Sequence, residues 1–343
     1  MRIPIGLCIV LALVAMAQPA AKPTKSDKPR KDAKTAAPAL PKLGIKTPGV
    51  QIPFAGLKAE AEFAVAPPWM IFTDAPLLPN LEKDSLDKID LKANKLGDPI
   101  TGLSKPCGGG VTAFTSLWVP TCGDKTLARL DTKTGKVTRK LPTGTAGVAP
   151  QVAASADSMW IFSDDKVTLS RIDPELNQVV AELRLPAGCN SLTFGETSLW
   201  VTCPSENRVL RINPQNIQVE KHIETSAQPK ALVIGEGSVW VLCEKEGKIE
   251  RIDPKTNKIS KTIELGAPAT GGAIADGLGS LWVTMQGFPL TRIDTTTEKV
   301  VQQFYGDGGG DIHVGLGSLW LTNLNNGTLW RIDPKRVAAT LAE

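Results

Sequence analysis

One phrase of seven residues recurs along most of the chain and constrains its fold more than any other feature. The phrase centres on Trp between apolar and β-forming residues, and its clear copies are TSLWVPT at 115–121, DSMWIFS at 157–163, TSLWVTC at 197–203, GSVWVLC at 237–243, GSLWVTM at 279–285 and GSLWLTN at 317–323. A weaker seventh copy, PPWMIFT, stands at 67–73. The seven Trp residues are 38 to 49 residues apart, a period that is typical of repeat architectures.

A second phrase follows each clear Trp copy ten or eleven residues later, in forms such as ARLDTKTGKV, LRINPQNIQV and ERIDPKTNKI. Within a unit, four short apolar runs are separated by turn residues, which indicates four antiparallel strands. Around Trp240 we expect these strands at 230–234, 238–243, 248–252 and 258–265. Seven such units predict an all-β fold, a seven-bladed β-propeller of four-stranded antiparallel blades that spans residues 49–343.

The residues of the strands and turns agree with this fold, but they do not decide which segments close the ring. Successive apolar residues around each Trp suit a strand that is covered on both faces, and Asp-Pro segments favour tight turns. In the first blade we expect 58–62 as the inner strand and 73–87 as an inserted loop. The last blade's outer strand comes either from 337–341 or from 49–54, and the sequence does not decide between them.

The N-terminal region predicts export. Residues 1–17 combine a basic start, an apolar run and the Ala-x-Ala pattern of a cleaved signal peptide. Residues 18–48 are rich in Lys, Pro and Ala, as in an extended tether. Up to residue 46 this segment carries a charge of +6, which leaves the folded part at −3. We expect a secreted or periplasmic protein without a transmembrane segment.

Five cysteines remain after the predicted signal peptide. Cys107 and Cys189 each lie eleven residues before a blade Trp, while Cys122 and Cys203 lie four and three residues after one. In a hairpin of the first two strands these positions face each other, so we predict the disulfides Cys107–Cys122 and Cys189–Cys203. Cys243 occupies the same blade position as Cys203, and a pairing between neighbouring blades remains the alternative.

The repeat resembles that of a known group. GSLWVT followed by RIDPxTxKV is similar to the repeats of virginiamycin B lyase (streptogramin lyase) and of YVTN-type propellers, over residues 57–343. The resemblance implies a seven-bladed ring. For the lyases it further implies a base that removes a proton next to a carbonyl and a metal ion that stabilises the resulting anion. In those lyases a His stands near the start of an inner strand, where this chain has Asn190, Lys230 or small residues.

Departures from the repeat indicate where a ligand binds. The position about ten residues before each Trp, close to the predicted channel, holds small residues in most blades but Asn190 and Lys230 in two of them. Small residues leave room for a funnel, which is the usual ligand site of such a ring. We therefore predict Asn190 and Lys230 as ligand-binding residues.

The last blade begins with an unusual glycine-rich segment, Tyr305 to His313. Asp307 and Asp311 in this segment are candidate metal ligands, together with acidic residues of 58–62, because carboxylates suit Mg²⁺ or Ca²⁺. Asp311 is also a candidate ligand-binding residue, and His313 is the candidate general base. The alternatives are a flexible acidic turn and a structural, hydrogen-bonded His.

From these features we expect a monomeric binding scaffold that presents the channel mouth to a protein, peptide or glycan and has no cofactor. The alternative is a metal-dependent lyase or lactonase-like enzyme with Mg²⁺ or Ca²⁺. We expect no nucleic-acid partner, because the folded part is acidic and the chain has a signal peptide. The basic tether is expected to make at most weak contact with an anionic cell surface.

Overall fold

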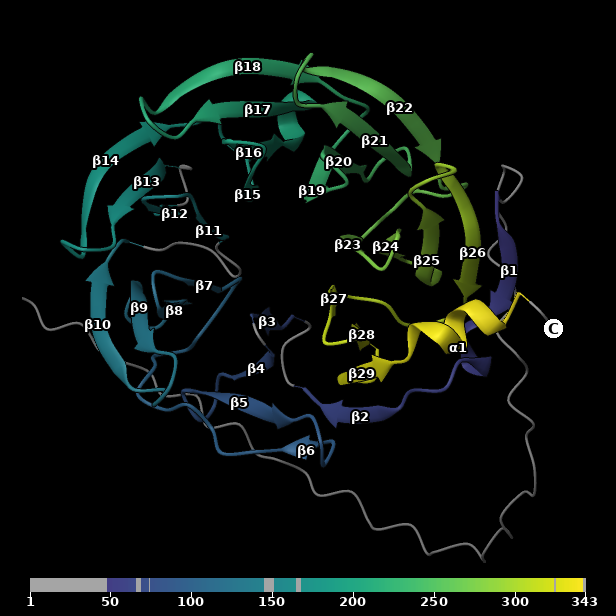
Figure 1. Cartoon of the computed structure of the whole chain (residues 1–343), viewed down its shortest axis with the longest axis horizontal. Helices are drawn as coiled ribbons and strands as arrows, with labels where there is room; N and C mark the ends of the chain where they lie inside the picture. The colour runs from purple at the N-terminus through teal and green to yellow at the C-terminus, as the bar shows by residue number, and fades with distance from the viewer. Residues whose placement is uncertain are drawn as a thin grey trace, which may run out of the picture. The chain divides into compact units, whose positions relative to one another are not determined.

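A computed structural model describes residues 48–341, except 66–68, 74, 145–150, 165–167 and 324. In this part of the chain seven sheets form a ring, and each sheet runs from one edge strand nearest the centre to its other edge strand at the outside (Figure 1). The predicted seven-bladed propeller is therefore confirmed. The predicted signal peptide, and the tether apart from Pro48, lie outside the described residues.

Four consecutive blades have four strands each, in chain order from the centre outward. They are β7 (Val111–Ala113), β8 (Ser116–Thr121), β9 (Thr126–Asp131) and β10 (Val137–Pro142); β11 (Val152–Ala154), β12 (Met159–Phe162), β13 (Thr168–Asp173) and β14 (Gln178–Arg184); β15 (Ser191–Gly195), β16 (Ser198–Cys203), β17 (Arg208–Asn213) and β18 (Gln218–Glu224); β19 (Pro229–Gly235), β20 (Ser238–Cys243), β21 (Lys248–Asp253) and β22 (Lys258–Glu264). The four strands predicted around Trp240 agree with β19 to β22 to within one residue at each end.

The recurring Trp residues form the core between blades. Trp118, 160, 200, 240, 282 and 320 are at most 1% exposed. Five of the six indole Nε1 atoms donate to a backbone carbonyl five residues earlier, as Trp200 does to Gly195 at 3.0 Å, and Trp160 donates to the Ser155 hydroxyl. The second strand of a blade is thus covered on both faces and its indole polar atom is satisfied.

The first blade corrects the predicted register. Its strands are β3 (Ile71–Phe72), β4 (Pro76–Asn80), β5 (Ser85–Asp90) and β6 (Lys95–Leu96), so that residues 73–87 contain a hairpin and not an inserted loop. Leu77 faces Lys88 across β4 and β5, just as Trp118 faces Arg129 in the next blade. Leu77 therefore takes the position of the blade Trp, and the inner strand consists of Ile71 and Phe72 from the weak copy.

Ring closure also differs from the predictions. β2 (Ala61–Ala64) pairs with β29 (Thr328–Ile332) and completes the seventh blade, whose other strands are β27 (Ile312–Gly315) and β28 (Ser318–Asn323). Residues 58–62 are therefore not the inner strand of the first blade. The chain ends in α1 (Pro334–Ala339), not in a strand. Asp333 explains the helix, because its side chain accepts from the Lys335 backbone N–H and Pro334 favours the first helical position.

The segment 50–64, here called the N-terminal latch, joins two blades from outside. β1 (Val50–Pro53) adds a parallel fifth strand to the sixth blade, which consists of β23 (Ala273–Gly277), β24 (Ser280–Met285), β25 (Phe288–Asp294) and β26 (Lys299–Tyr305). A short 3-10 turn, η1 (Phe54–Gly56), follows. Phe54 stacks on Trp330 of the seventh blade with ring centroids 5.0 Å apart, and the latch then continues into β2. Phe54, Leu57 and Phe63 are all buried.

Among the described residues, the Arg of the second phrase ties neighbouring blades together in four of the six clear repeats. In all six repeats with a clear Trp copy, the guanidinium lies over the Trp ring of its own blade, 4.9 to 5.8 Å from the ring centroid. Arg211 also donates to the Pro254 carbonyl and to the Asn257 amide oxygen of the next blade, at 2.6 and 2.8 Å. Arg171 differs, since its hydrogen bonds among the described residues stay within its own blade, on Ser158 and Asp157. The next blade has Ile217 at the position of Asn177 and Asn257.

This difference predicts unequal effects for one substitution. Arg211→Met removes two charge-assisted hydrogen bonds between blades, each worth about 1.5 to 3 kcal/mol, whereas Arg171→Met removes none between blades. We expect Arg211→Met to lower the free energy of unfolding by about 2 kcal/mol more than Arg171→Met, as measured by urea unfolding. Equal midpoints for the two variants would show that the bridge to the next blade contributes nothing.

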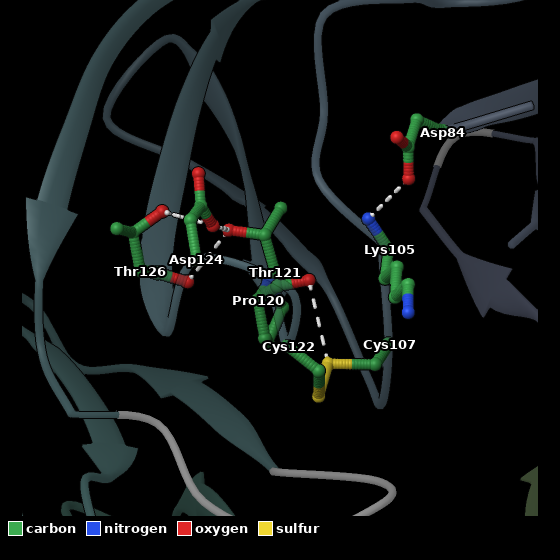
Figure 2. Close-up of a disulfide and its surroundings, with 8 residues drawn as sticks. All are labelled: Asp84, Lys105, Cys107, Pro120, Thr121, Cys122, Asp124 and Thr126. Carbon is green, nitrogen blue, oxygen red and sulfur yellow. Dashed lines mark hydrogen bonds between the residues drawn. A yellow bond between two sulfur atoms is a disulfide. The ribbon is translucent and has the colours of Figure 1, made fainter.

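Both predicted cysteine pairs lie at disulfide distance. Cys107 is bonded to Cys122, with Cα atoms 5.9 Å apart, as Figure 2 shows. Backbone hydrogen bonds hold the segment before β7 against the end of β8, where Cys107 donates to Pro120 and Cys122 donates to Lys105. Asp84 accepts from the Lys105 backbone N–H at 2.8 Å and ties the same segment to the first blade (Figure 2).

The second pair is Cys189–Cys203, with Cα atoms 3.9 Å apart. Cys243 is free and buried, so the alternative pairing between neighbouring blades is not formed. Burial, followed by the nearby Glu250 carboxylate, raises the pKa of the Cys243 thiol far above its usual value, which keeps the thiol protonated and unreactive. None of the helices in the described ranges is long and apolar enough to cross a membrane.

Candidate functional site

The inner strands of five blades surround a cavity of about 650 Å³ at the centre of the ring. Its wall comes from β11, β15, β19, β23, β27 and the residues just before them. Its size is in the range of small-molecule sites. Asn190, Lys230, Asp311 and His313 all line this cavity, so four of the predicted site residues converge there.

Asn190 and Lys230 lie side by side at the start of neighbouring inner strands. The Thr202 hydroxyl donates to Asn190 Oδ1 at 2.8 Å and lies 3.3 Å from the Lys230 carbonyl. Lys230 Nζ is 3.2 Å from Glu244 Oε1, and that oxygen also accepts from the Gly271 backbone N–H at 2.7 Å. The charge of Lys230 is thus balanced, and the exposed Asn190 presents an amide to the cavity.

Asp311 and His313 form a hydrogen-bonded pair on the seventh blade. His313 Nε2 lies 3.1 Å from Asp311 Oδ2. The same carboxylate oxygen accepts from the Met70 backbone N–H at 3.2 Å, and the imidazole stacks on Phe72 with centroids 5.2 Å apart and planes 6° from parallel. The pair therefore sits at the seam between the last and first blades, and residues of both blades fix its orientation.

Glycine makes this stacking possible. A Cβ atom at Gly315 would lie 2.6 Å from two ring atoms of Phe72, closer than van der Waals contact allows. Phe72 can therefore lie against β27 only because residue 315 has no side chain. His313 itself is half-buried and reaches the cavity wall, so it is not enclosed in apolar core.

The predicted metal ligands are not brought together. Asp307 lines a separate hollow of about 280 Å³ with Gln286, Asn325 and neighbouring glycines, whereas Asp311 lines the central cavity. Glu60 pairs with Arg331 at 3.5 Å on the outer edge of the seventh blade. Within the described residues no three His, Cys, Asp or Glu side chains are grouped so that they could hold a metal ion. These residues therefore do not fit the metal of the lyase mechanism.

Sequence reasoning missed one charged residue of the cavity, Asp276 on β23. The position six residues before the Trp holds Asp only in this blade, and the clear repeats have Thr112, Ala154, Phe194, Ile234 and Val314 there. Burial, and next the Glu236 carboxylate, raises the pKa of Asp276 above its usual value. Comparison of the six repeats at that position would have singled it out.

A larger hollow of about 850 Å³ lies between the second and third blades. Arg129 and Arg171 line it, but both guanidinium groups already bind groups of the ring. Arg129 donates to Ser116, Pro174 and Asn177, and Arg171 donates to Ser158 and Asp157. The central cavity is the better candidate, because the deviations from the repeat gather in its wall.

Comparison with solved structures agrees with the fold. A streptogramin B lyase structure superposes with a TM-score of 0.66 at 18% sequence identity, covering 79% of this chain and 95% of the lyase. Selenomethionine-substituted virginiamycin B lyase from Staphylococcus aureus gives a TM-score of 0.64 at 16% identity, covering 79% of this chain and 97% of that one. The chain therefore has the propeller fold of these lyases. No family model matches it, and neither does any curated protein.

Proposed function

We propose that this protein is an exported, non-catalytic binding propeller that holds the end of a peptide or glycan, or another small polar ligand, in its central cavity. The observation that carries the proposal is the convergence of Asn190, Lys230, Asp311 and His313 on one cavity of about 650 Å³. Rigid inner strands position these groups, and such strands hold a binding site more firmly than surface loops do.

Each group has a clear role in this proposal. The Asn190 amide nitrogen donates to a ligand carbonyl or hydroxyl, while its oxygen stays on Thr202. Lys230 adds a second donor near the same end of the cavity. The His313 imidazole keeps Nδ1 for the ligand, since Nε2 faces Asp311. Apolar residues such as Leu192, Ile274 and Val314 complete the wall and contribute hydrophobic contact.

Export and the monomeric state are part of the same proposal. Two disulfides at blade hairpins are typical of oxidising compartments, and the N-terminal sequence supports a signal peptide and a basic tether. The ring closes on itself through β2, so the protomer needs no second copy to satisfy its seventh blade. No cofactor is required for binding of this kind.

The second candidate is a lyase similar to virginiamycin B lyase, favoured by one observation, the His313–Asp311 pair at the cavity wall. A carboxylate that orients an imidazole supports general-base chemistry. Among the residues that the structure describes, no group fits the metal on which the lyase mechanism depends. We therefore expect virginiamycin B to remain unchanged on incubation with the protein, as judged by liquid chromatography.

A matched pair of substitutions tests the binding proposal. Thr193→Trp places an indole in the cavity wall, whereas Thr262→Trp makes the same change on the exposed outer strand β22. In a ¹⁹F NMR screen of small polar fragments, we expect fragments that bind the unmodified protein to lose at least tenfold in affinity in Thr193→Trp and to keep it in Thr262→Trp.

Thermal unfolding of both variants checks that the ring is intact, and Asn190→Trp at the exposed rim replaces Thr193→Trp if the latter does not fold. Fragment binding that is equal in the two variants would contradict the proposal, as would the absence of fragment binding to the unmodified protein.

A further inference from the structure

Asp276 is the one charged side chain of the cavity wall that no group of the described residues balances. Lys230 pairs with Glu244, and Asp311 faces His313 and accepts from the Met70 backbone N–H. For Asp276, by contrast, the described residues provide no hydrogen bond to the carboxylate and no ion pair. A half-buried carboxylate without donors is costly, because the cavity wall replaces part of its hydration.

The surroundings of Asp276 make this cost larger, not smaller. Glu236, in the turn between β19 and β20, adds a second negative charge nearby, and burial and this charge both raise the pKa of Asp276. Gly235 of the neighbouring blade leaves room for the carboxyl group, since a Cβ there would collide with it. The described residues thus accommodate a carboxylate at this position while providing no cation for it.

The position of Asp276 along the ring axis, relative to Asn190 and Lys230, indicates an extended ligand. Asp276 lies four residues after Gly272, a distance of about 13 Å along a strand. Asn190 and Lys230 occupy the same blade position as Gly272, and therefore lie toward the opposite end of the cavity. Val233 and Ile274 line the wall between the two ends. An apolar chain with a hydrogen-bond acceptor at one end and a cation at the other fits this order of groups.

We propose that Asp276 binds the alkylammonium group of the cavity's ligand, and that the ligand is an unbranched amine with an amide or similar acceptor at its far end. The inference rests on the proposed function, because it assumes that the cavity holds a ligand. A divalent metal ion does not explain the site, since the part of the chain that the structure describes groups no second and third acidic or imidazole ligand with Asp276. A primary ammonium needs only one carboxylate and gains a charge-assisted hydrogen bond.

Two probes that differ only in charge test the proposal on the full chain. N-acetyl-1,5-diaminopentane has an acetamide and an ammonium, and N-acetylpentylamine has the same acetamide and a neutral end. We expect calorimetric titration in 150 mM salt to show at least tenfold tighter binding of the charged probe. Asp276→Asn should remove this preference, whereas Asp307→Asn, in the separate hollow, should retain it.

Four outcomes decide the matter. A preference for the charged probe that survives in Asp276→Asn would overturn the assignment, as would equal binding of the two probes. If both probes bind equally and both are lost in Thr193→Trp, only the role of Asp276 fails and the cavity remains the binding site. If neither probe binds at 50 mM, the inference and the proposed function both fail. Asp276→Asn is nearly isosteric, and unfolding in urea confirms that it folds.

Discussion

Removing the N-terminal latch is expected to unfold most of the propeller. A chain that begins at Val65 lacks β1, η1 and β2, and so loses the buried side chains of Phe54, Leu57 and Phe63. Each such side chain contributes about 1.5 to 3 kcal/mol, and their sum approaches the total stability of a typical domain, about 5 to 15 kcal/mol. The seventh blade would also be left with β29 as an unpaired edge, which promotes aggregation.

The measurement is urea unfolding followed by Trp fluorescence, with a chain that begins at Pro48 as the control that keeps the latch. Within the full chain, Phe63→Ala is expected to cost about 3 to 5 kcal/mol, and Val50→Ala, at a side chain that is 52% exposed, close to nothing. A chain beginning at Val65 that unfolds at the same urea concentration as the control would show that β2 does not close the ring.

Loss of both disulfides is the second large effect that we expect. The bonds Cys107–Cys122 and Cys189–Cys203 close loops of 15 and 14 residues, and loops of this length restrict the unfolded chain by about 3 kcal/mol each. Replacing all four cysteines by Ala should therefore lower the free energy of unfolding by about 6 kcal/mol. Dithiothreitol should lower the urea midpoint of the unmodified protein and leave that of the fourfold variant unchanged.

The free Cys243 provides the control for this experiment. It is buried without a partner sulfur, so Cys243→Ala should leave the response to dithiothreitol intact. A midpoint of the unmodified protein that is the same with and without reductant would contradict the contribution of the disulfides.

The repeats allow most of the ring to be predicted from the sequence. Strands β19 to β22 agree with the prediction because Trp240 and the turn after Arg251 fix both ends of the repeat. The prediction for the first blade is wrong because it aligns Trp69 with the other blade Trp residues, although the second phrase of this blade, DKIDLKANKL at 87–96, follows Trp69 only after a longer gap. The rule that a blade Trp faces the residue eleven positions later would have placed Leu77 opposite Lys88, as the structure does.

Ring closure and half of the site depend on contacts between the two ends of the chain. Nothing local tells 50–53 from 61–64 as the closing strand, since both are short and β-forming, and the choice depends on which edge each one meets. The position about ten residues before each blade Trp predicts Asn190 and Lys230 as residues of the site. The setting of His313 depends on Phe72 and Met70, about 240 residues away in sequence, and no pattern along the chain contains that contact.

The central claim is that the cavity between the inner strands holds the ligand. Its most direct test is a crystal structure of the protein soaked with the tightest-binding fragment from the ¹⁹F screen. We predict density for the fragment inside the ring, within hydrogen-bond distance of Asn190 or His313. Density found only in the outer hollow beside Arg129 and Arg171 would contradict the claim.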